Sequence, residues 1–132
     1  MSDQLLGDGP RDRLVTVART ALGDSLRSAT YFTHNDYEQI YLRSDLERDA
    51  DLMAFIGAEW QDYNVTQGAY SNSELGEYQF TIRAFDNGYL VRITRSDRGV
   101  FVTTDGITMQ DFRSAAESVD DILGDLAGES RQ

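Results

Sequence analysis

The chain has 132 residues, of which 40% are hydrophobic, and a formal net charge of −11. This length is enough for one domain with its own core. The chain contains no Cys, which excludes disulfides, thiolate nucleophiles and Cys-ligated metal sites. The net negative charge argues against general binding to DNA or RNA, because neutralising phosphates requires a basic face.

The charge balance also indicates an environment. The chain has 23 acidic residues against 12 basic ones, every base is Arg, and Asp outnumbers Glu. We expect a halophilic source, because salt screens the self-repulsion of such a surface. The alternative is a mesophilic acidic protein that mimics nucleic acid, but the acids are spread over every segment. No apolar run reaches transmembrane length and the N-terminus lacks a basic region, so we expect a cytoplasmic protein without membrane contact.

The first half of the chain predicts two helices and a hairpin. Residues 1–9 are expected to be a flexible tail, and Pro10 opens a helix whose apolar residues recur at helical spacing to Leu22. Two strands, residues 29–33 and 37–43, are joined by a turn at His34-Asn35-Asp36.

Ser44 and Glu47 form a capping box at the start of a second helix, which we expect to end near Tyr63. Residues 64–76 are polar and contain Gly, so we expect a loop there, and its length makes it a candidate binding loop.

The second half predicts a three-stranded meander followed by a helix. Strands at residues 78–85, 89–95 and 100–104 alternate between two faces. With Asn87-Gly88 as the two-residue hairpin loop, Arg83 would lie directly opposite Arg92. A last amphipathic helix follows, capped by Thr108 and Asp111, with a short tail at residues 128–132.

The resulting order is α-β-β-α-β-β-β-α, an α+β domain over residues 10–127. This order resembles the roadblock and longin domains, within a wider group that includes profilin-like and PAS-like sheets. The resemblance implies a five-stranded, mainly antiparallel sheet in the order 2-1-5-4-3, with helices on both faces. The stretches ALGDSLRSATYFT (residues 21–33) and GVFVTTDG (residues 99–106) resemble small haloarchaeal proteins of unknown function.

Arginines are concentrated in the meander: Arg83, Arg92, Arg95 and Arg98 place a third of all bases within sixteen residues. One face of this meander is a candidate partner-binding site for an acidic protein or an anionic ligand. Its residues are Arg83, Arg92, Phe85, Leu90 and Phe101. The alternative, which the acidic turns of the second helix favour, is that this helix packs there and forms internal ion pairs.

Residue types that carry catalysis or metal binding are sparse. His34 is the only His; it lies beside Asp36 and Glu38, but His-Asn-Asp is also ordinary turn composition. The acidic clusters lack the alternating spacing and the Gly of a calcium-binding loop. No motif for nucleophilic catalysis or phosphate binding is present, so we predict no enzyme activity, no metal and no cofactor.

We therefore predict a non-enzymatic interaction module that homodimerises through a helix or a sheet edge. The fold resemblance alone implies that a small GTPase is a conceivable partner. The alternative is a PAS-like sensor of a small ligand, with a pocket between the sheet and the loop at 64–76. Trp60, Tyr63 and Tyr70 could line that pocket, although aromatics at a helix end more often close the core.

Overall fold

The computed structural model describes residues 6–45, 52–70, 72–95 and 97–126. The elements follow in the order α1 (Asp8–Leu22), a short 3-10 helix (Gly23–Ser25), β1 (Leu26–Thr33), β2 (Tyr37–Leu42), α2 (Leu52–Tyr70), β3 (Thr81–Phe85), β4 (Gly88–Arg95), β5 (Arg98–Thr104) and α3 (Met109–Leu126). This order confirms the α+β arrangement expected from the sequence.

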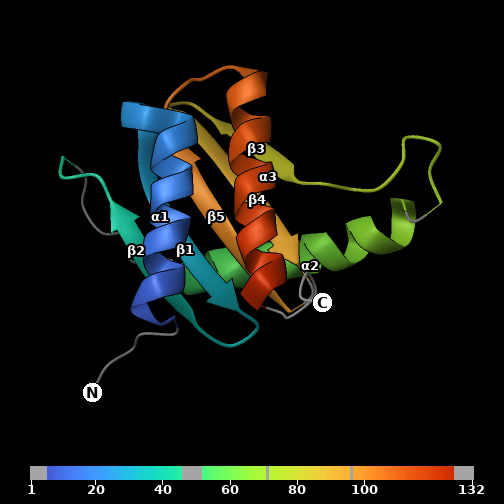
Figure 1. Cartoon of the computed structure of the whole chain (residues 1–132). Helices are drawn as coiled ribbons and strands as arrows, with labels where there is room; N and C mark the ends of the chain where they lie inside the picture. Colours follow the sequence, from blue (N-terminus) through green and yellow to red (C-terminus); the bar gives the residue numbers. More distant parts are fainter. Residues whose placement is uncertain (1–5, 46–51, 71, 96, 127–132) are drawn as a thin grey trace.

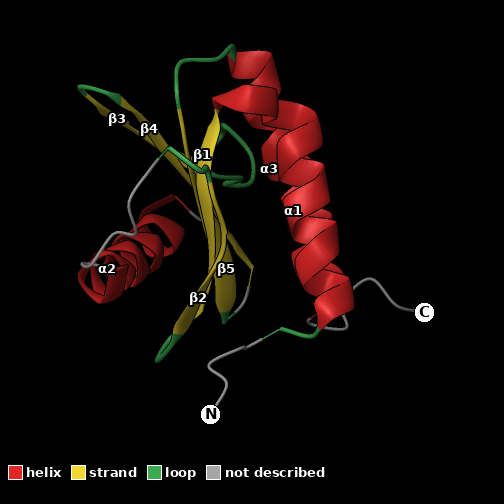
Figure 2. Cartoon of the chain, turned by 90° about the vertical axis from the view of Figure 1, so that its left-hand side faces the viewer, coloured by secondary structure: helices red, strands yellow, loops and turns green. Residues whose placement is uncertain are grey.

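The five strands form one antiparallel sheet in the order β2-β1-β5-β4-β3, as the fold resemblance implied. Figure 1 shows α1 and α3 side by side on one face of this sheet, and Figure 2 shows α2 on the other face. The sheet is therefore the middle layer of three.

The main core lies between the sheet and the pair α1–α3. The apolar stripe of α3 is buried from Phe112 to Leu123, as its helical spacing predicts. The strands contribute alternate residues to this core, among them Val91, Ile93, Val100 and Val102, each no more than 1% exposed. At the start of α3, the Thr108 hydroxyl accepts a hydrogen bond from the Asp111 backbone N–H at 3.1 Å, which confirms the predicted cap.

A smaller core lies under α2. It consists of Phe32, Ile56, Trp60, Leu90 and Phe101. The Phe32 ring contacts Trp60 edge-on, with 5.5 Å between centroids, and Phe101 at 5.6 Å. The Trp60 indole N–H donates to the Thr33 carbonyl at 3.1 Å, so α2 is anchored to the end of β1.

The register of the β3–β4 hairpin differs from the sequence prediction. Phe85 pairs with Gly88, so the two-residue loop is Asp86-Asn87 rather than Asn87-Gly88. Arg92 therefore lies opposite Thr81 and not opposite Arg83. This slip moves each partner by two residues, and because side chains alternate with a period of two, every residue keeps its predicted face.

Close packing accounts for the position of Gly88 in the strand. Its backbone does not use positive φ, which among the described glycines occurs only at Gly23 and Gly76. A Cβ at Gly88 would lie 2.5 Å from the carbonyl oxygen of Thr104 on β5. The neighbouring strand, rather than a left-handed turn conformation, requires glycine here.

Several predicted boundaries are wrong. Strand β1 begins at Leu26 rather than at residue 29, and β3 begins at Thr81 rather than at residue 78. Helix α1 begins at Asp8, inside the expected tail, and Pro10 lies in its first turn, where backbone N–H groups have no helical partner anyway. Helix α2 continues to Tyr70, so the first seven residues of the predicted loop at 64–76 are helical. Propagating an existing helix needs no new nucleus, which explains why this polar stretch stays helical. The predicted capping box at Ser44 and Glu47 extends outside the described residues.

Gly88→Ala should destabilise the fold by about 1–3 kcal/mol, because the new methyl group must displace the β5 backbone. Gly68→Ala is the matched control: Gly68 lies within α2 with nothing near its Cβ position, so alanine there should be neutral or stabilise by up to about 1 kcal/mol. Urea unfolding at fixed KCl concentration measures both. A neutral Gly88→Ala would contradict the close-packing explanation.

Candidate functional site

A buried charge network joins α2 to the sheet. The Arg92 side chain on β4 is 0% exposed. Its Nη1 donates to a carboxylate oxygen of Glu59 at 2.9 Å and to the Glu59 carbonyl at 2.8 Å. Asp62, one turn further along α2, lies 3.0 Å from the same nitrogen. A buried charge is tolerated only when it is paired and hydrogen-bonded in this way.

The other end of the Arg92 guanidinium fixes the chain that leads into β3. Its Nη2 donates to the Tyr78 hydroxyl at 2.7 Å and to the Thr81 hydroxyl at 2.8 Å. These two hydroxyls also hydrogen-bond to each other. The Arg92 guanidinium lies 5.7 Å from the centroid of the Tyr63 ring. One side chain thereby connects β4, α2 and the segment before β3.

Arg83 completes the network at its outer side. Its Nε donates to Glu59 at 2.9 Å, and its Nη2 lies 3.3 Å from Asp62. The hydrogen bond to Glu59 is the main cause that raises the pKa of Arg83 above its ordinary value. Two arginines and two carboxylates thus balance each other between α2 and the sheet.

The five predicted partner-binding residues are divided between interior and surface. Arg92, Leu90 and Phe101 are buried beneath α2, at 0%, 5% and 1% exposure. Phe85 is 62% exposed and the Arg83 side chain is 36% exposed. The ion pairs of Arg83 and Arg92 with α2 agree with the alternative interpretation, in which this helix packs on the arginine-bearing face of the sheet. Partner binding by the five residues stays a prediction, and only Arg83 and Phe85 are accessible to a partner while α2 is in place.

A second surface feature lies at the β3 side of the molecule. Helix α2 projects past this edge of the sheet (Figure 1). Large apolar side chains are exposed on both elements: Val65 at 65% and Tyr70 at 56% on α2, and, separately, Phe85 at the hairpin end of β3, which lies away from α2 (Figure 2). Exposed apolar groups beside an open sheet edge are typical of interaction surfaces.

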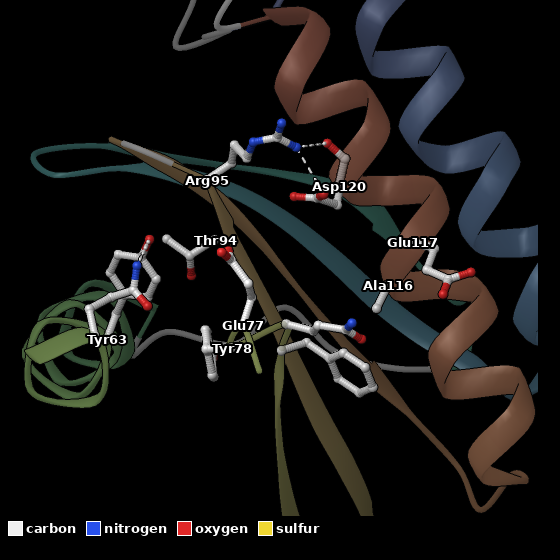
Figure 3. Close-up of a pocket in the computed structure, with 11 residues that line it drawn as sticks. Tyr63, Glu77, Tyr78, Thr94, Arg95, Ala116, Glu117 and Asp120 are labelled. Carbon is white, nitrogen blue, oxygen red and sulfur yellow. Dashed lines mark hydrogen bonds and ion pairs between the residues drawn. The ribbon is translucent and has the colours of Figure 1, made fainter. Parts of the chain in front are cut away.

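A cleft of about 490 Å³ opens between α2 and α3 (Figure 3). We call it the α2–α3 cleft. It is lined by Tyr63, Gln67, Glu77, Tyr78, Gln79, Phe80, Thr94, Arg95, Ala116, Glu117 and Asp120. Of the described residues in the predicted loop at 64–76, only Gln67 lines it. Burial raises the pKa of the Tyr63 hydroxyl, so this group stays neutral at ordinary pH.

A cluster of ion pairs connects the chain segments at one end of the sheet. Asp105, just after β5, accepts hydrogen bonds from Arg43 at 2.8 Å and from Arg27 at 3.1 Å. Arg43 also donates to Asp45 at 2.7 Å and to the Asp24 carbonyl at 2.8 Å. Arg43, followed by Arg27, holds the pKa of Asp105 below its ordinary value. These contacts are structural, since they join chain segments around the sheet end.

Other predicted site residues occupy ordinary positions. His34 is exposed and stacks on Trp60, with ring centroids 3.9 Å apart. Within the described ranges, no three His, Asp or Glu side chains are arranged to hold a metal ion. None of the described helices is long and apolar enough to cross a membrane.

Comparison with known protein families gives a match over residues 12–124. The chain belongs to the family described as a domain of unknown function, DUF7522. A search of curated proteins finds no match.

The fold is that of MglB, a roadblock/longin-like protein. The gliding protein MglB from Thermus thermophilus aligns with a TM-score of 0.64 at 15% identity, over 95% of this chain and 98% of its own. Myxococcus xanthus MglB aligns with a TM-score of 0.65 at 10% identity, over 95% of both chains. A further structure, described as MglB with a tetrameric arrangement, aligns at 0.62 with 15% identity, over 95% of this chain and 98% of its own.

Arg92→Met should destabilise the fold by about 3–5 kcal/mol, because it leaves Glu59 buried with only part of its charge compensated. Adding Glu59→Leu should recover part of that loss. Arg83→Met is the control at the exposed side of the network and should cost about 1 kcal/mol or less. Urea unfolding measures all three variants, and equal losses for Arg83→Met and Arg92→Met would contradict the assigned burial.

The Asp105 cluster predicts a pH dependence. Since the pKa of Asp105 is lowered in the folded state, its stabilisation is complete above the ordinary Asp value of 3.8 and is lost as pH falls through the lower folded value. Asp105→Asn should therefore lower stability at neutral pH and lose less further stability on acidification than the parent chain. Parallel acid-unfolding curves for both proteins would contradict the contribution of this carboxylate.

Proposed function

We propose that this protein is a non-enzymatic interaction module that forms a homodimer through the outer edge of β3 and the projecting end of α2. The open edge of β3 carries the proposal. Among the described strands, β3 pairs only with β4, so its outer N–H and C=O groups are free to pair with a second strand.

The end of α2 supports the same surface. Residues 64–70 of α2 extend beyond the small core under this helix, and the side chains of Val65 and Tyr70 are more than half exposed. Burying these side chains against a second copy would add a hydrophobic contribution to the strand pairing. The tetrameric arrangement of one MglB structure is consistent with a fold that assembles with itself.

We further propose that the assembled module binds an acidic protein partner in the cytoplasm of a halophile. Arg83 and Phe85 are the two accessible residues of the predicted partner-binding set, and they lie next to the proposed dimer edge. An exposed Arg beside an aromatic side chain suits an acidic surface. A small GTPase is a candidate by fold analogy alone.

Light scattering after size-exclusion chromatography, in multimolar KCl, should give the mass of a dimer. Val65→Asp combined with Phe85→Asp should shift the mass to a monomer, because charges would be buried at the interface. Met109→Asp is the matched control: Met109 is 59% exposed at the start of α3, on the opposite face of the sheet, and should leave the dimer intact.

A monomer of the parent chain in high salt would contradict the dimer. Dissociation by Met109→Asp to the same extent would indicate a general effect of added charge. The same chromatography in dilute buffer tests the halophilic environment: expansion or unfolding is expected there, since 23 acids would repel one another without screening.

A further inference from the structure

We propose that the α2–α3 cleft binds a small organic cation, with a primary ammonium or guanidinium group on a short chain. Its volume, about 490 Å³, lies in the range of small-molecule sites. The cleft adjoins the proposed dimer surface, because Gln67 lines it and also lies in the projecting end of α2. Ligand binding there does not require the dimer.

The sheet register creates the cleft. Residue Thr81 of β3 pairs with Arg92 of β4, whereas β4 continues to Arg95. The residues Ile93, Thr94 and Arg95 therefore pair with β5 only. Because the segment before β3 leaves the sheet at this point, residues from α2 and α3 reach the same opening across the sheet edge.

The charges of the lining favour a cation. Figure 3 shows Glu77 on the segment before β3 and Glu117 on α3, across the cleft from it. Neither carboxylate has a hydrogen bond or ion pair with any described residue. Arg95, the one cation in the lining, has its Nη1 bonded to the Asp120 carboxylate at 2.8 Å. Both carboxylates are exposed, so they would repel an anionic ligand and attract a cationic group that enters the cleft beside either of them.

A buried hydroxyl provides an independent indication of a ligand. The Thr94 side chain lines the cleft and is only 8% exposed, yet its oxygen has no hydrogen-bond partner among the described residues. In Figure 3 it lies between Tyr63 and Glu77. A buried polar group without a partner is unfavourable, and a hydroxyl oxygen that lines the cleft can accept an N–H from an ammonium or guanidinium group.

Aromatic side chains supply the rest of the recognition. Tyr63, Tyr78 and Phe80 line the cleft and can contact the alkyl chain or the cationic head of the ligand. Arg113 lies outside the lining; it donates to Gln79 at 2.7 Å and lies over the Phe80 ring, 5.7 Å from its centroid. That contact shows that an aromatic ring at this cleft already accommodates one guanidinium.

Isothermal titration of the full chain with butylguanidinium and butylammonium should detect binding, and the neutral isostere butylurea should not bind. Glu77→Gln and Glu117→Gln should each weaken binding by up to about fivefold, as expected for the loss of one exposed charge contact. Glu74→Gln is the matched control, since Glu74 is exposed in the same segment but outside the lining, and it should leave affinity unchanged.

The Thr94→Val variant distinguishes an effect on ligand affinity from an effect on stability. It removes an unpartnered hydroxyl, so the unfolding midpoint should stay the same or rise while the affinity for butylguanidinium falls. Unchanged affinity in Thr94→Val would overturn the role of this hydroxyl. Equal binding of butylurea, or no binding of either cation at about 10 mM, would overturn the site as a whole.

Two sources of the cationic group can be distinguished by competition with butylguanidinium. Competition by spermidine but not by a short Arg-containing peptide would assign the site to free small molecules. Competition by the peptide alone would assign it to a basic side chain of another protein. If neither spermidine nor the peptide competes at millimolar concentrations, the proposed ligand class is wrong.

Discussion

The buried guanidinium of Arg92 is the constraint on which the arrangement of α2 depends. A buried full charge must have hydrogen-bonding partners, and Glu59 on α2 and the Tyr78 hydroxyl supply them here. Hydrophobic contacts through Phe32 and Trp60 are non-directional, whereas this network sets the position of α2 along the sheet.

The Arg92 network also determines which surfaces of the sheet remain exposed. Because Nη2 of Arg92 binds Tyr78 and Thr81, the chain enters β3 only at the position opposite Arg92. The last residues of β4 then lie at the α2–α3 cleft, and β3 remains a short outer strand. The β3–β4 register therefore exposes both the proposed dimer edge and the proposed cation site, which adjoin each other at the end of α2.

Arginine has a connecting role in this acidic protein. Arg13 on α1 pairs with Asp125 on α3 at 3.0 Å, Arg95 joins β4 to Asp120 of α3, and Arg43 joins the end of β2 to Asp105. Each pair links elements far apart in the sequence. Planar guanidinium groups suit this role, because they bind carboxylate and carbonyl oxygens at the same time.

The sequence by itself determined the order of elements, the two faces of the meander and the buried stripe of α3, because these depend on local periodicity. It could not determine the hairpin register, since a two-residue slip leaves the face of every side chain unchanged. The partners of Arg83 and Arg92 and the α2–α3 cleft were decided only by tertiary structure. They depend on contacts between residues that are far apart in the sequence, and local sequence patterns do not specify such contacts.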